Sequence, residues 1–187
     1  MDSEFSRLMP GDEVVKLPTF NATRAVTIHA KPEHIFPWIV QMGVTPRAGW
    51  YSIDLFDNLG KPSAEVILPA LQHSQSGDLI PMSPNGKSGT YIKDFVPNQW
   101  MLWGDKAGTS TWVWGLHPID ETHTRLITRV RMKYHWLSSA LIFDVLVEFT
   151  DIIMMRQSML GIQRRAECRA KEARVLPPSG LELGAED

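Results

Sequence analysis

Five polar residues have side chains of the types that acid–base and anchoring chemistry uses: Tyr51, Asp54, His117, Glu148 and Arg156. Tyrosine, carboxylate and histidine groups move protons beside a bound molecule, and an arginine binds carboxylate or carbonyl oxygens. No spacing typical of a known catalytic motif joins these residues. We therefore take them as candidates for catalysis, although each is more often a structural residue than a catalytic one.

The sequence contains no pattern typical of a metal site or a covalent nucleophile. Its six histidines form no pair four residues apart with an acidic companion, and its single cysteine, Cys168, cannot form a zinc-binding cysteine pair. GxSxG, GxGxxG and the phosphate-binding P-loop are all absent from the sequence. We therefore expect no metal and no cofactor, and any enzymatic activity is expected to be metal-independent.

Arg156 interrupts an apolar helical face between Ile152 and Leu160, where a charge is costly without a partner or access to water. In one interpretation it reaches water or pairs with a carboxylate such as Glu148 or Asp54. In the other it is a cation at a pocket wall that anchors an acidic or carbonyl-bearing ligand. The sequence leaves both open, so Arg156 is also a candidate ligand contact.

Two tryptophans, Trp112 and Trp114, lie two residues apart in a predicted strand and therefore point to the same face of a sheet. In the following strand Arg125, Arg129 and Arg131 share one parity, and we expect their face to meet water. The opposite, apolar face of both strands then lines the interior. Core packing and a wall for an aromatic or polycyclic ligand explain this interior face about equally well.

The predicted ligand contacts come from these two strands and from the C-terminal helix. They are Trp112, Trp114, Leu116, Leu126, Thr128, Val130, Phe149, Ile152, Ile153 and Arg156. On the same helix Asp144, Glu148 and Asp151 form a narrow acidic strip. Such a strip is more often a solvated face than a catalytic carboxylate pair, and the sequence does not decide whether it faces water or the cavity.

The alternation of apolar and polar residues, together with the positions of proline, glycine and serine, predicts the helices and strands that position these residues. Residues 21–30 alternate as a strand, Pro32 opens a helix that Gly43 ends, and Ser52 is the expected N-cap of a second, short helix. Residues 64–71 favour a further turn or two of helix. Short strands with tight connections follow, and such neighbours must be antiparallel. They cover residues 78–82, 90–96, 100–103, 109–117 and 124–132.

A long segment without proline follows the last strand. Residues 137–171 predict one helix of about 30 residues, which would extend roughly 45 Å across a small domain, and its end beyond Gln163 is expected to be exposed. The chain is thus divided into an N-terminal arm (1–20), one domain (21–173) and a disordered tail (174–187). The order of strand, helices, strands and long helix indicates an α+β fold.

Composition excludes some classes of function. The formal net charge is -2, with 19 basic and 21 acidic residues, which does not indicate binding to nucleic acid or anionic lipid. Residues 1–10 lack the apolar core of a signal peptide, and acidic residues interrupt the apolar stretch 136–155. Together with the single cysteine, this predicts a cytoplasmic protein without stable membrane insertion. The oligomeric state stays open.

Several segments together resemble the START-like superfamily, also called SRPBCC or the birch-pollen-allergen fold. The similarity is greatest to its bacterial polyketide cyclase/dehydrase and lipid-transport-like branch. The segments are TRAVTI (23–28), PEHIFPWIVQMG (32–43), GWYSID (49–54), the strand opening 77–78, and residues 112–118 and 124–126. The resemblance spans about residues 22–173 and implies a helix-grip fold. In that fold a curved antiparallel sheet wraps around a long C-terminal helix and encloses an apolar cavity. Members differ in chemistry, so no catalytic residue is carried over.

The leading functional hypothesis is the binding or carrying of a small hydrophobic molecule (a lipid, a polyketide or an aromatic compound) in that cavity. It depends on the aromatic and methionine-rich interior and on the lack of a catalytic motif in the sequence. The alternative is an enzyme similar to polyketide cyclases and dehydratases, in which polar residues of the same cavity move protons. An interaction module is a third class, but no exposed apolar patch is visible in the sequence to support it.

Overall fold

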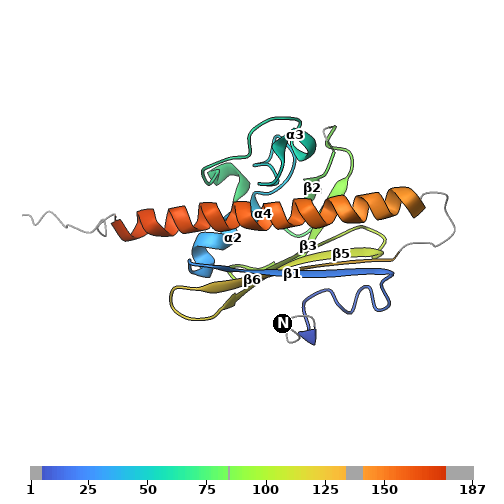
Figure 1. Cartoon of the computed structure of the whole chain (residues 1–187), viewed down its shortest axis with the longest axis horizontal. Helices are drawn as coiled ribbons and strands as arrows, with labels where there is room; N and C mark the ends of the chain where they lie inside the picture. The colour runs from blue at the N-terminus through green and yellow to red at the C-terminus, as the bar shows by residue number, and fades with distance from the viewer. Residues whose placement is uncertain (1–5, 84, 134–140, 176–187) are drawn as a thin grey trace, which may run out of the picture.

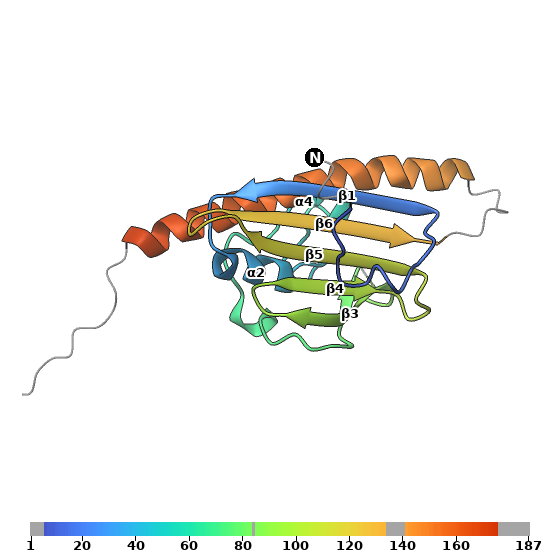
Figure 2. The same ribbon diagram turned by 90° about the horizontal axis from the view of Figure 1, so that it is seen from below.

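The structure is a computed structural model that describes residues 6–83, 85–133 and 141–175, with side chains in the last range from Ile153 onward. Its body is one sheet of six antiparallel strands in the order β1-β6-β5-β4-β3-β2 (Figures 1 and 2). The strands are β1 (Phe20–Ile28), β2 (Leu79–Pro81), β3 (Gly89–Val96), β4 (Trp100–Gly104), β5 (Ser110–Pro118) and β6 (Thr124–Met132). Strands β2 to β6 are neighbours in the sheet as in the chain, because short connections join them. The antiparallel sheet predicted from the sequence is confirmed.

A long helix, α4 (Leu141–Val175), crosses one face of this sheet (Figure 1). Helix α2 (Pro32–Val40) packs against α4 and against strands β4 and β5. The short helix α3 (Asp54–Asp57) and the 3-10 turn η1 (Pro69–Leu71) lie in the segment that joins α2 to β2. This is a helix-grip α+β architecture, so the START-like resemblance is confirmed at the level of the fold. Among the described helices, none combines the length and the apolarity that crossing a bilayer requires.

The segment after α2 corrects two local predictions. Residues 64–71 form no helix beyond η1, because the buried side chain of Gln41 binds their backbone instead. Its amide donates to the carbonyl of Val66 at 3.1 Å and accepts from the N–H of Leu68 at 2.9 Å, which satisfies groups that a helix would pair. Ser52 is not the N-cap of α3: Ile53 precedes the helix, and the Ser52 hydroxyl donates to Asp57.

The inner face of the sheet carries the main apolar core. The register of β5 and β6 places one set of paired residues on this face: Trp112 with Val130, Trp114 with Thr128, and Leu116 with Leu126. Trp114 and Leu126 are fully buried there, in a cluster that also contains Ile35 and Ile39 of α2. The inward orientation expected from strand alternation is therefore what the structure shows.

The N-terminal arm partly covers the outer face of the sheet, although the shared parity of Arg125, Arg129 and Arg131 predicted that this face meets water. Residues 6–19 run across it (Figure 2), and Met9 and Val15 are buried against it. Arg129 is only 3% exposed, with its guanidinium 2.6 Å from the carboxylate of Asp12, and Arg131 donates to the carbonyl of Val15 at 3.0 Å. The prediction was wrong for Arg129 because the arm supplies a carboxylate and carbonyl oxygens that replace water around the guanidinium groups.

The buried side of α4 also differs from the predicted one. From Ile153 onward, its buried positions recur at helical spacing: Met155, Ser158, Met159, Ile162, Arg165, Ala166 and Ala170. Ile153 and Leu160, which were expected on the apolar inner face, are 44% and 37% exposed. The helix also stays partly buried beyond Gln163. Apolar residues occupy several sides of α4, so their periodicity alone did not fix which side meets the sheet.

Candidate functional site

An apolar cavity of ≈ 230 Å³ lies between β5, α4 and the segment that carries α3. Among the described residues, its apolar lining consists of Val44, Trp50, Phe56, Leu59, Met82, Trp112, Met154 and Met155. Three polar residues, Ser52, Asp57 and Ser158, complete the described lining. Phe56, Leu59 and Met82 are more than half exposed, so the apolar lining continues to the molecular surface.

The sheet side of the cavity is a fixed aromatic wall. Trp50 and Trp112 stack with their ring centroids 5.8 Å apart and their planes 6° from parallel. The fully buried Trp103 meets the Trp112 ring edge-on at 5.1 Å. The indole N–H of Trp112 donates to the hydroxyl of Thr128 at 2.7 Å, and that hydroxyl donates to a backbone carbonyl of β5 at 3.0 Å. The polar edge of Trp112 is thereby satisfied within the sheet, and the ring is held in one orientation.

Asp57 is the ionisable residue of the described lining. Its Oδ2 accepts a hydrogen bond from the Ser52 hydroxyl, while its Oδ1 is buried and has no hydrogen-bond partner among the described residues. No ion pair joins Asp57 to a lysine, arginine or histidine within the described ranges. Burial raises the pKa of the Asp57 carboxyl, and the nearby charge of Asp54 raises it further. The described lining of the cavity therefore contains one carboxyl group, and one of its two oxygens is buried without a hydrogen-bond partner among the described residues.

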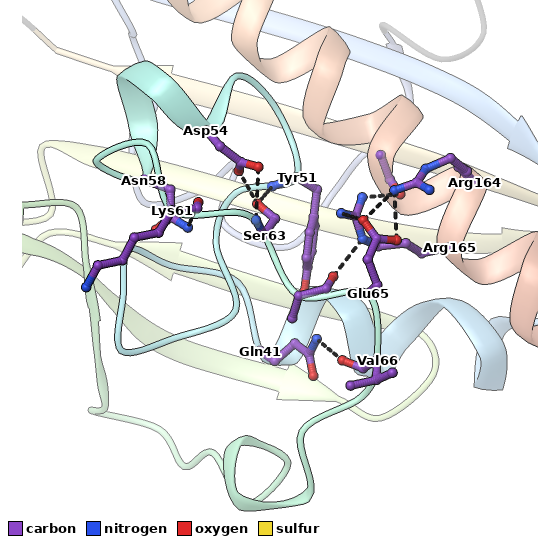
Figure 3. A network of polar contacts seen from close by, with 12 residues as sticks. Gln41, Tyr51, Asp54, Asn58, Lys61, Ser63, Glu65, Val66, Arg164 and Arg165 are labelled. Atoms are coloured by element: carbon purple, nitrogen blue, oxygen red, sulfur yellow. Dashed lines mark hydrogen bonds and ion pairs between the residues drawn. The ribbon is translucent and has the colours of Figure 1, made fainter.

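Hydrogen bonds hold the segment that carries Asp57 (Figure 3). The carboxylate of Asp54 accepts from the backbone N–H of Ser63 at 2.9 Å and from its hydroxyl at 2.5 Å. The Ser63 hydroxyl in turn accepts from the N–H of Tyr51 at 3.1 Å. The side chain of Asn58 bonds to the backbone N–H of Thr45 at 3.0 Å and to the carbonyl of Lys61 at 2.7 Å. The lining residues between Trp50 and Leu59 thus belong to a loop that a network of hydrogen bonds holds in place.

Tyr51 fastens this loop to α2 and α4. Its hydroxyl donates to the carbonyl of Trp38 at 3.1 Å, and the Arg165 guanidinium lies over its ring at 4.6 Å from the centroid. Arg165 also pairs with Glu65 at 2.6 Å (Figure 3). Gly161 permits the close approach of the Tyr51 backbone to α4, because a Cβ at position 161 would lie 2.1 Å from the Tyr51 carbonyl oxygen. Burial raises the pKa of the Tyr51 hydroxyl, which is therefore held as a neutral hydrogen-bond donor.

The structure brings one predicted ligand contact, Trp112, to the described lining of the cavity. Trp114, Leu116 and Leu126 lie in the core, Val130 is buried beside them, and Thr128 supports Trp112 from within the sheet. Ile153 is exposed on α4. The side chains of Phe149 and Ile152 lie outside the described residues, and so does the acidic strip of Asp144, Glu148 and Asp151.

Of the described catalytic candidates, Tyr51 and Asp54 meet at the Ser63 hydroxyl, and none of the described candidates lines the cavity. Tyr51 and Asp54 hold the loop, as described above. His117 lies on the outer face of the sheet, where its side chain approaches Gly115 rather than the cavity. Arg156 is exposed, so it does not interrupt a buried face as the sequence suggested. The buried arginine of this helix within the described residues is Arg165, and Glu148 lies outside the described side chains.

Sequence reasoning missed Asp57, Ser52 and Ser158 as cavity residues. No sequence signal was available for Asp57, because in the four-residue helix α3 it belongs to the first turn, where an acidic residue is common. The two serines carried no signal either. Within the described residues, no three His, Cys, Asp or Glu side chains form a group that could hold a metal ion.

The chain matches no family model, and no curated protein is similar to it in sequence. Similar solved structures include a conserved protein of unknown function from Enterococcus faecalis, with 11% identity, coverage of 92% of this chain and 86% of that chain, and a TM-score of 0.47. A protein from Chromobacterium violaceum is 13% identical, covering 79% and 98% with a TM-score of 0.49. A polyketide-cyclase-like protein from Corynebacterium glutamicum is 14% identical, covering 83% and 91% with a TM-score of 0.38. At these identities the likeness concerns the fold alone, and no residue role is carried over.

Fold and site together define a helix-grip protein with an apolar cavity between its sheet and its long helix. The aromatic wall, the methionines of α4 and the Asp57 carboxyl group are known from the described residues of this chain and not from the similar structures. The function is therefore argued from the cavity.

Proposed function

We propose that the protein binds a small hydrophobic molecule in the cavity between β5 and α4. The observation that carries this proposal is an apolar cavity of ≈ 230 Å³ with a fixed tryptophan wall. Apolar cavities of about 150 Å³ already bind benzene, so this volume suits a body of one or two rings or a short acyl chain. Small-molecule sites are typically apolar clefts with a few polar groups that set orientation.

The cavity volume narrows the range of ligands. A long-chain lipid or a polycyclic polyketide would need more space than ≈ 230 Å³, whereas a compact aromatic compound would not. The tryptophan and methionine side chains favour aromatic ligands, because indole rings are flat and thioether groups are polarisable. The exposed apolar residues at the mouth, Phe56, Leu59 and Met82, give such a molecule a continuous apolar path from the surface.

Thermal unfolding with methylnaphthalene tests the proposal. A ligand that binds only the folded protein raises the melting temperature as its concentration increases. Ser158 is a small, buried lining residue, so Ser158→Leu places extra apolar volume in the cavity. We expect methylnaphthalene to stabilise the wild type, and we expect Ser158→Leu to lose most of that ligand-dependent rise.

Gln157→Leu is the control, because it places the same leucine side chain at an exposed neighbouring position outside the cavity lining. It should keep the wild-type response to methylnaphthalene. An unchanged melting temperature of the wild type across a range of compact aromatic compounds would contradict the proposal, as would an equal rise in Ser158→Leu.

A second candidate is an enzyme similar to the polyketide cyclases and dehydratases. The observation that favours it is Asp57, a carboxyl group of raised pKa in an apolar cavity, which is a setting used for proton transfer. Incubation of the protein with polyketide-like diketones, followed by mass spectrometry, distinguishes it from a binder. A product that forms with the wild type and not with Asp57→Asn would favour the enzyme.

A further inference from the structure

Asp57 gives the cavity a specific electrostatic character. The carboxyl group lies in the lining beside Trp50 and Ser158, with Oδ2 bound by Ser52 and Oδ1 buried without a partner among the described residues. The charged group that acts most strongly on it is Asp54, which is also negative and is held in place by Ser63. An ionised Asp57 is therefore a half-buried anion in a negative local field, which is a costly arrangement without a compensating cation.

The walls of the same cavity suit a cation. The rings of Trp50, Phe56 and Trp112 all contribute to the lining. Aromatic faces attract an ammonium group through their quadrupoles, and the attraction is greatest where water is excluded. A carboxylic acid would face the opposite situation, because its anion would meet the like charge of Asp57. A hydroxyl group could donate a hydrogen bond to the Asp57 carboxylate but would not compensate its charge.

We propose that the cavity takes compact aromatic molecules that carry a protonated amine, and that the carboxylate of Asp57 pairs with that amine. This inference rests on the proposed function and names its ligand class. The apolar body of the ligand fills the space between Trp112 and the methionines of α4, and the amine points toward α3. Ser52 keeps the carboxylate oriented by occupying Oδ2.

Isothermal titration calorimetry with four ligands of one carbon skeleton tests the inference: naphthylmethylamine, naphthylmethanol, methylnaphthalene and naphthoic acid. A charged hydrogen bond contributes about 1.5–3 kcal/mol, so the amine should bind about ten- to a hundredfold more tightly than methylnaphthalene. The acid should bind most weakly of the four. In Asp57→Asn, which has nearly the same shape, the amine should lose this preference while methylnaphthalene keeps its affinity.

Asp94→Asn is the control, since it removes an exposed carboxylate of β3 outside the cavity lining and changes the net charge by the same amount. It should leave the order of the four affinities unchanged. Equal binding of the amine and the alcohol to the wild type would overturn the inference, and so would an amine preference that persists in Asp57→Asn. In either case binding of methylnaphthalene would leave the proposed function standing. If none of the four binds, both fall together. The wild-type series decides the matter even if a variant does not fold.

Discussion

Asp54 and Asp57 lie three positions apart on α3, yet their carboxylates have different surroundings. Asp54 accepts two hydrogen bonds from Ser63 and holds the loop closed. Asp57 has one oxygen bound by Ser52 and one oxygen buried without a partner among the described residues. The hydrogen bonds of Asp54 stabilise the fold, whereas the Asp57 carboxyl group can still accept a hydrogen bond. This contrast makes Asp57 the residue on which the ligand proposal depends.

The pH dependence of stability should report on Asp57. Burial is the main cause that raises its pKa in the folded protein, while the pKa in the unfolded protein is about 4. The folded state then binds this proton more firmly than the unfolded state does. The associated stability is present below about pH 4 and is lost as the pH rises through the folded-state pKa.

Asp57→Asn removes this titration, so at about pH 7 the empty variant should melt at a higher temperature than the wild type. The difference should shrink as the pH falls toward about 3, where Asp57 is mostly protonated in both states. Melting curves at several pH values provide the measurement, with Asp94→Asn as the control for net charge. A variant that is less stable than the wild type at neutral pH would show that the ionised carboxylate supports the fold instead.

At the scale of elements, the position of α4 depends on its contact with the loop at Tyr51. The Arg165 guanidinium covers the Tyr51 ring, and Gly161 lets the Tyr51 backbone approach the helix. The same helix supplies Met154, Met155 and Ser158 to the cavity, while the loop supplies Trp50 and its neighbours. The distance between these two elements therefore sets the width of the cavity.

Gly161→Ala should be destabilising, although alanine is the better helix former by about 1 kcal/mol. The added Cβ would lie 2.1 Å from the Tyr51 carbonyl oxygen, in a loop that Ser63 and Asp54 hold in place. We expect a net loss of about 1–3 kcal/mol in the free energy of unfolding, as is typical of overpacking. Urea denaturation measures the change, and Gln157→Ala on the exposed side of α4 is the control. Stabilisation by Gly161→Ala would indicate that α4 and the loop are not tightly packed.

For the whole molecule, the sequence predicted the fold well because the fold depends on short-range patterns. The alternation in residues 109–117 and 124–132 placed Trp112, Trp114 and Leu126 on the inner face, and the structure agrees. The antiparallel pairing of β2 to β6 followed from the short connections between them, whereas the pairing of β1 with β6 was not predicted. These signals are local, so they survive in a single sequence.

The site could not be predicted in the same way, because it depends on contacts between distant segments. Arg165 is buried because Tyr51 and Glu65 contact it. Tyr51 precedes Arg165 by more than a hundred positions in the chain. Arg129 is buried because Asp12 of the arm covers it. Arg156 is exposed because of the way α4 is rotated about its axis. That rotation depends on tertiary packing, and the sequence periodicity does not predict it because apolar residues occupy several sides of the helix.

The central claim is that a compact aromatic ligand lies against Trp112 inside the cavity, and tryptophan indole N–H signals in an NMR titration test it most directly. The chain has seven tryptophans, each of which can be assigned by a Trp→Phe variant. Titration with methylnaphthalene should shift the signals of Trp50 and Trp112, which line the cavity. The signal of Trp100, which packs with the cluster on the outer face of the sheet, should stay in place. Shifts at Trp100 without shifts at Trp50 and Trp112, or no shifts at a saturating concentration, would contradict the account.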